Sequence, residues 1–193
     1  MGERQMEVHR SSLDVLARAS LLVSEGLLSL SPTAQTRPIE LPSIFWDKTL
    51  EMHGQGVMLV LEKRLRATDM DPNQGRLSIP KLQVRADFLS GEEVRTLDNK
   101  EAITVSLIEP CLEVRHGLQL KKWNYQSGTF SYVLIKQWNA VARRFERNSL
   151  EENSLVQLWS FRVDGDLCFC LVNLGAPSAA AAAAAAEHMA AHE

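Results

Sequence analysis

Residues 131–172 read SYVLIKQWNAVARRFERNSLEENSLVQLWSFRVDGDLCFCLV. The apolar run at residues 132–135 predicts a strand, and a helix is expected from Gln137 onward because apolar side chains recur at i, i+3, i+4 and i+7. These side chains are Trp138, Val141, Ala142 and Phe145. Residues 155–163 and 167–172 predict two more strands, joined through Asp164 and Gly165, a pair typical of tight hairpins. This stretch therefore predicts a strand, a helix and a β-hairpin in that order.

Upstream of this stretch the dominant hydrophobic period is two, which is typical of strands. The expected strands begin around residues 59–65 and continue at 77–79, 103–107 and 118–123. Ser90 and Glu93 form a capping box that predicts a short helix from Gly91 toward Leu97. Seven strands and two short helices that do not alternate with them predict a mainly β protein, an antiparallel or mixed barrel.

The 193 residues suffice for one domain with flanking segments. In residues 1–56, Ser12 caps an expected short amphipathic helix, and prolines and glycines at residues 32–56 predict a linker. Residues 57–174 form the expected domain. Residues 175–193 contain eight consecutive alanines and are interpreted as a low-complexity tail.

Composition excludes several classes of protein. No apolar stretch approaches the roughly 20 residues that span a bilayer, so no membrane contact is expected. Cys111, Cys168 and Cys170 lack paired metal-type spacing, which favours a reducing compartment and no metal. The net charge is −3, but residues 57–174 hold 16 basic and 15 acidic residues. Any basic surface on this domain must therefore be local.

No pattern of catalytic residues is present. Asp69 and Asp71 begin like a calcium loop, but Pro80 occupies the position where a bidentate glutamate is needed, so a turn is expected. Serine-hydrolase, phosphate-loop and zinc-protease motifs are missing. We therefore expect no enzyme and no cofactor.

Four segments together resemble the plant B3 DNA-binding domain family over residues 58–174. They are LEKRLRATDM at 61–70, RLSIPK at 76–81, WN at 123–124 and SYVLIKQW at 131–138. The last three are similar to the family's Arg-Leu-x-Ile-Pro-Lys, Trp-Asn and Ser-Tyr-Val-Leu-Thr-Lys-Gly-Trp. The resemblance implies a seven-stranded open β-barrel, the DNA-binding pseudobarrel, with two short α-helices, to which this chain adds the N-terminal helix. It also implies a nuclear, sequence-specific regulator of transcription that clasps the major groove of double-stranded DNA between two arms.

The resemblance also implies the DNA-binding residues. The first arm, residues 66–76, contributes Arg66, Thr68, Asn73, Gln74 and Arg76, together with Arg64 before it. The second arm, residues 121–131, contributes Lys121, Lys122, Trp123, Asn124, Gln126, Ser127 and Ser131. Arginine can bridge guanine O6 and N7, and asparagine or glutamine can pair with adenine. The two lysines of the second arm and Lys81 are expected to neutralise phosphates.

Other interpretations stay open at the level of sequence. One alternative is that Trp123 and Tyr132 pack the barrel and do not contact DNA. Asp71 also brings a negative charge to the first arm, which has no lysine between Thr68 and Gly75. The near-neutral domain and acidic flanks suggest a second hypothesis, a protein-interaction module that has lost DNA affinity and contacts its partner through the N-terminal helix. A third hypothesis, an enzyme like the restriction nucleases of related fold, lacks a catalytic motif.

Overall fold

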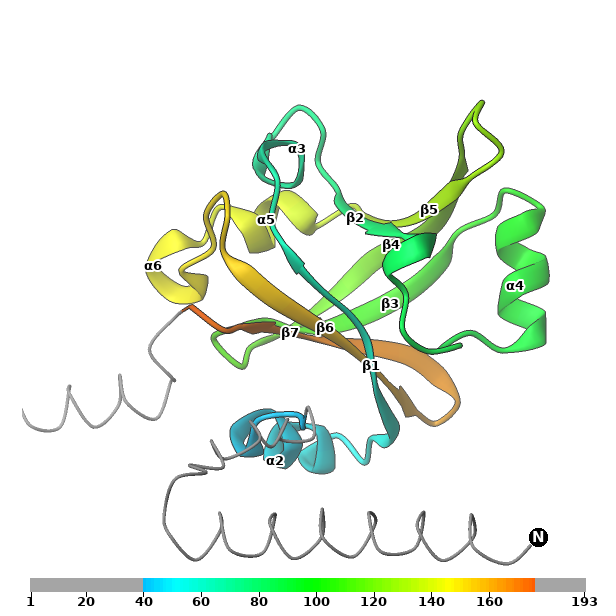
Figure 1. The fold of residues 1–193 in the computed structure, drawn as a ribbon. Coiled ribbons are helices and arrows are strands. Elements are labelled where there is room, and N and C mark those ends of the chain that lie inside the picture. Colours follow the sequence, from blue (N-terminus) through cyan, green and yellow to red (C-terminus); the bar gives the residue numbers. More distant parts are fainter. Residues whose placement is uncertain (1–39, 176–193) are drawn as a thin grey trace, which may run out of the picture. The chain divides into compact units, whose positions relative to one another are not determined.

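The computed structural model of the chain describes residues 40–175, which form a seven-stranded mixed sheet curved into a nearly closed barrel (Figure 1). The strands are β1 (Gln55–Arg64), β2 (Leu77–Pro80), β3 (Ile103–Ile108), β4 (Val114–Asn124), β5 (Phe130–Ile135), β6 (Leu155–Val163) and β7 (Asp166–Asn173). Their order is β1-β6-β7-β3-β4-β5-β2, and every pair is antiparallel except β3–β7. The predicted mainly β barrel is confirmed.

Short helices connect or flank these strands. They are α2 (Ser43–Glu51), α3 (Ala67–Met70), the 3₁₀ helix η1 (Lys81–Gln83), α4 (Gly91–Asp98), α5 (Trp138–Ala142) and α6 (Phe145–Asn148). The expected N-terminal helix, with its proposed partner contact, and the alanine-rich tail lie outside the described residues.

Local sequence signals account for several of these elements. Ser90 Oγ accepts a hydrogen bond from the Glu93 N–H, and the Glu93 carboxylate accepts one from the Ser90 N–H, so the predicted capping box begins α4. Between β6 and β7, Asp164 and Gly165 have φ values of 51° and 91°. Positive φ at both central residues is the geometry that matches the twist of a two-residue hairpin, as predicted.

The barrel has apolar side chains on both faces of β6 and β7. Trp138, Phe161 and Phe169 are among the largest fully buried side chains. Trp138 and Phe169 lie in the main core, whereas Phe161 and Trp159 belong to a second cluster that includes Phe45 of α2. Burial in that cluster raises the pKa of Cys170 to about 12, in agreement with its interpretation as a small core residue.

The expectation of a linker up to residue 56 is wrong for α2. Pro42 precedes this helix, where its missing N–H breaks no helical hydrogen bond. Phe45 and Thr49 are buried, and Thr49 is within 3.6 Å of Cys170 Sγ. Tertiary burial against the second cluster stabilises a helix that its proline-rich flank did not predict.

The predicted helical face that ends at Phe145 is also incorrect. Trp138, Val141 and Ala142 are buried, but the chain leaves helical geometry at Arg144, and Phe145 is 58% exposed. Arg144 lies 3.5 Å from the fully buried Glu109. Arg144 also donates a hydrogen bond to Glu113, so the break between the two short helices coincides with ion pairs to the β3–β4 connection.

A buried polar network joins β1 and β2, the two edge strands of the sheet. The Asp69 carboxylate accepts hydrogen bonds from Lys63 Nζ (2.7 Å), the Arg66 N–H (2.8 Å) and the Ser78 N–H (2.9 Å). Lys63 also donates to the Ser78 carbonyl at 3.0 Å, and the Trp138 indole donates to the Asp69 carbonyl at 2.7 Å. We call these contacts the Asp69 network. It explains why a lysine interrupts the apolar face of β1.

The network is mostly dry. The side chains of Lys63 and Asp69 are 6% and 1% exposed. Burial lowers the pKa of Lys63, although the hydrogen bond that Lys63 donates to Asp69 opposes this effect. A buried ammonium without its carboxylate would cost far more free energy than the pair does.

Asp69→Asn should therefore lower the free energy of unfolding by about 3–5 kcal/mol, because the Lys63 ammonium stays buried without a counter-charge. Urea unfolding at pH 7 measures this change. Asp71→Asn is the matched control, since Asp71 is partly exposed and an asparagine oxygen can still accept its bond from the Asn73 N–H. The free energy of unfolding of this control variant should differ from that of the wild type by no more than roughly 0.5 kcal/mol. Similar losses in both variants would contradict the role of the network.

Helix α4 is fixed to β6 by a two-point ion pair. Arg162 donates to the two Glu93 carboxylate oxygens at 2.5 and 2.7 Å and to the Phe88 carbonyl at 2.8 Å. Burial alone would raise the pKa of Glu93, but hydrogen bonds from Arg162 and from the Ser90 N–H hold it below its ordinary value of 4.5. The folded protein thus favours the ionised carboxylate.

Protonation of Glu93 should contribute to a loss of stability in acid. Because its pKa is lower when folded, its contribution is complete above about pH 4.5 and is lost as the pH drops through the lowered value. Glu93→Gln should therefore be less stable than the wild type at pH 7, and this difference should shrink toward pH 3. Thermal unfolding across pH 3–7 measures it. Glu92→Gln, on an exposed neighbour, should show a much smaller pH-dependent difference; an equal one would contradict the assignment.

Candidate nucleic-acid interface

The first arm and the second arm project from the same side of the barrel (Figure 1). The first contains α3, and the second is the end of the β4–β5 hairpin. Strand β2 leaves the first arm and pairs with β5, with Leu77 opposite Leu134 and Pro80 opposite Ser131. This pairing fixes the base of the first arm at one end of β5 and the base of the second arm at the other end.

The first arm is held at two points. The Asp69 network fixes α3 near its base, and Asn139 of α5 donates to the Pro72 carbonyl at 2.8 Å. Within the arm, the Asp71 carboxylate accepts a hydrogen bond from the Asn73 N–H at 2.8 Å, which forms a local turn. Thr68, Asn73 and Gln74 are exposed, as a contact surface requires.

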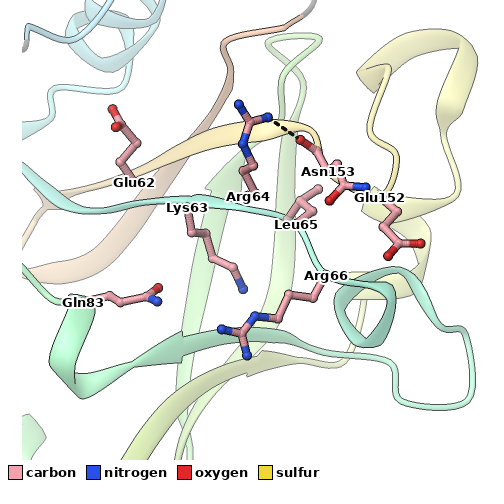
Figure 2. Close-up of a pocket in the computed structure, with 8 residues that line it drawn as sticks. All are labelled: Glu62, Lys63, Arg64, Leu65, Arg66, Gln83, Glu152 and Asn153. Carbon is pink, nitrogen blue, oxygen red and sulfur yellow. Dashed lines mark hydrogen bonds between the residues drawn. The ribbon is translucent and has the colours of Figure 1, made fainter.

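The side chains of Arg64, the last residue of β1, and Arg66, two residues later, point to opposite sides of the chain (Figure 2). Arg66 and Gln83 line a pocket of about 370 Å³ into which Lys63 also turns. Arg64 also lines this pocket, but its guanidinium turns away and donates to the Asn153 carbonyl at 3.0 Å. The structure therefore places Arg66 beside the first arm and engages Arg64 elsewhere.

The two adjacent lysines of the second arm lie on opposite faces of β4. Lys122 Nζ is 2.5 Å from the Asp98 carboxylate of α4 and 4.2 Å from the centre of the Phe130 ring. Lys121 belongs to the face of Trp123 and takes part in no ion pair among residues 40–175. Lys81 lies 3.9 Å from Asp87, and both side chains are exposed. Of the two lysines of this hairpin, Lys121 is thus the one whose ammonium has no ion-pair partner among residues 40–175.

One contact joins the polar groups of the two arms. The Arg76 guanidinium lies 4.8 Å from the centre of the Trp123 ring, and Arg76 donates a hydrogen bond to Gln74 Oε1. Trp123 is neither in the core nor fully exposed. Trp123 therefore contacts Arg76 from outside the described core clusters.

The tip of the second arm is an ordered turn. The Tyr125 N–H donates to the Thr129 carbonyl at 2.9 Å, and the Gly128 N–H donates to the Tyr125 carbonyl at 3.1 Å. Asn124, Gln126 and Ser127 are exposed there. Ser131 differs, since it is only 3% exposed between β2 and β4, and we leave it out of the surface. Tyr125 is 46% exposed at the tip, but the sequence analysis did not include it among the surface residues of the arm. Its place between Asn124 and Gln126 was a signal that could have identified it.

The predicted residues thus fall into two groups. Those exposed on the arms are Arg66, Thr68, Asn73, Gln74, Asn124, Gln126 and Ser127, and Arg76, Lys121 and Trp123 are half-buried there. Those engaged or buried elsewhere are Arg64, Lys122 and Ser131, and Lys81 lies beyond β2 beside Asp87. Across residues 40–175, no group of three or more His, Cys, Asp or Glu side chains could hold a metal ion, and no helix could cross a bilayer.

Comparison with known proteins gives consistent matches. The family model described as B3 domain-containing protein At2g31720-like matches residues 39–174. The B3 domain-containing protein At2g32645 of Arabidopsis thaliana is 34% identical over 127 residues, 62% of this chain and 66% of that protein. At3g25182 of the same organism is 35% identical over 153 residues, 73% of this chain and 42% of that protein. The chain thus covers less than two thirds of each relative's length.

A crystal structure of the Arabidopsis thaliana transcription factor LEC2–DNA complex is also similar, with a TM-score of 0.42 and 17% identity, over 64% of this chain and 98% of that one. The family assignment depends on the sequence matches, because the family model extends over residues 39–174, well beyond half of the chain. The resemblance in RLSIPK, WN and SYVLIKQW is thereby confirmed. The chain belongs to the B3 domain-containing protein family.

Proposed function

We propose that this chain is a non-enzymatic, sequence-specific DNA-binding protein that regulates transcription in the nucleus, with both arms entering the major groove of a duplex. Membership of the B3 family supports this proposal. The observation that carries it is the contact of Arg76 with Trp123, because it brings one side chain of each arm into a shared surface. Loops presented by a rigid barrel are a common means of recognition.

The exposed groups on the arms match the chemistry of DNA. Arg76 can bridge O6 and N7 of guanine, and Asn124 or Gln126 can pair with adenine. Lys121 and Arg66 can neutralise phosphates without reading sequence. The small number of free cations predicts an affinity that depends on few phosphate contacts.

The salt dependence of binding tests this proposal. The logarithm of affinity should fall linearly with the logarithm of salt concentration, by a slope of about 0.9 for each neutralised phosphate. Lys121→Ala should weaken binding to all sequences and reduce this slope by about 1. Fluorescence anisotropy with mixed-sequence duplexes, and then with a duplex from random selection, gives both quantities.

Lys122→Ala is the matched control, because Asp98 already neutralises that lysine. Its salt slope should stay close to that of the wild type. Equal slope changes in the two variants would contradict the assignment of Lys121. A wild-type protein that binds no duplex at roughly 50 mM salt would overturn the proposal and favour the protein-interaction module.

A further inference from the structure

We propose that Trp123 of the second arm positions Arg76 of the first arm, so that the two arms read one G·C pair as a single unit. This inference rests on the proposed DNA binding. It assigns Trp123 the part of a positioning residue, which acts through Arg76, in place of a separate contact to DNA. The supporting observations are the strand register, the stacking distance and the partners of the guanidinium.

The strand register fixes the backbone positions from which the Arg76 and Trp123 side chains extend. Leu77, next to Arg76, lies opposite Leu134 of β5, whereas Trp123 lies opposite Ser131 at the other end of that strand. Arg76 must therefore extend across β5 to come within 4.8 Å of the Trp123 ring. The β5 side chains on this face, Ser131 and Val133, are 3% and 0% exposed, as expected beneath such a crossing.

A position over an aromatic ring suits guanine recognition because the ring favours a guanidinium that lies flat against it. A flat guanidinium over an aromatic face keeps its N–H groups at the edge, where two can donate in parallel to O6 and N7. Gln74 Oε1 accepts one N–H of Arg76, which orients the group further and leaves other donors free. The rotamers that arginine would lose on binding are already restricted in the free protein.

A lysine cannot replace this arrangement, since its ammonium is a point charge without a planar pair of donors. Leucine in place of Trp123 would remove the aromatic face, and phenylalanine would keep one. The inference thus predicts different outcomes for variants of similar size.

Selection from random duplexes tests the unit with the full chain of the wild type, Arg76→Ala, Trp123→Leu and Trp123→Phe. In the wild type, one position should be a strongly preferred G·C pair. Arg76→Ala should reduce discrimination there by about 5- to 150-fold. Trp123→Leu should reduce it at the same position by about 3- to 10-fold, and Trp123→Phe should keep it within about 2-fold. Affinity for unrelated duplexes should change little in these two Trp123 variants.

A double-mutant cycle then isolates the coupling. Trp123→Leu should have no further effect on discrimination when Arg76 is already alanine. An equal effect in that background, or a loss at a different base position, would overturn the inference while DNA binding stands. A wild type that selects no duplex would overturn both. If Trp123→Leu does not fold, Arg76→Lys decides, because retained discrimination with lysine contradicts a planar stacked reader.

Discussion

The arrangement of the barrel depends on the buried carboxylate of Asp69. A sheet with two edge strands leaves unpaired backbone groups along both edges, and natural sheets cover or pair such edges. Here Lys63 of β1 donates to the Ser78 carbonyl of β2 and to Asp69, so side chains close the seam that no ladder of backbone hydrogen bonds closes. The same carboxylate accepts the N–H groups of Arg66 and Ser78, at the two ends of the first arm. The same carboxylate therefore holds the two edge strands together and fixes the position of the first arm.

This constraint has consequences for the charges available to a nucleic acid. The domain is almost neutral, and several of its cations are already paired within the protein: Lys63 with Asp69, Lys122 with Asp98, and Arg162 with Glu93. The cations left beside or on the arms, Arg66, Arg76 and Lys121, are few, so recognition by this chain must depend on the geometry of individual groups more than on a broad basic field. The stacked Arg76 fits that requirement, because orientation contributes where long-range attraction is weak.

Much of the fold could be predicted because its signals are local. Alternating apolar residues, the Ser90–Glu93 capping box and the Asp164–Gly165 turn act over a few positions and appear in the structure as expected. Helix α2 and the break before Phe145 could not be predicted in this way, because they accompany contacts with residues distant in the sequence, the second cluster for α2 and Glu109 and Glu113 for Arg144. The candidate site followed the same division. Its residue types could be chosen from the sequence, but the pairing of Lys122 with Asp98 depends on the position of α4.

The sequence by itself determined the positions of the strands along the chain, the membership of the B3 family and the polar composition of the two arms, since each is written in short contiguous segments. Only the tertiary structure decided which of those polar groups are free. Trp138 and the Asp69 carbonyl that it binds are 69 residues apart, and Lys122 and Asp98 are 24 apart. No local pattern specifies such partners, because a side chain chooses its partner only after the barrel has brought distant strands together. The contact of Arg76 with Trp123 is also decided by the tertiary structure, and the proposed reading of one base pair by both arms depends on it.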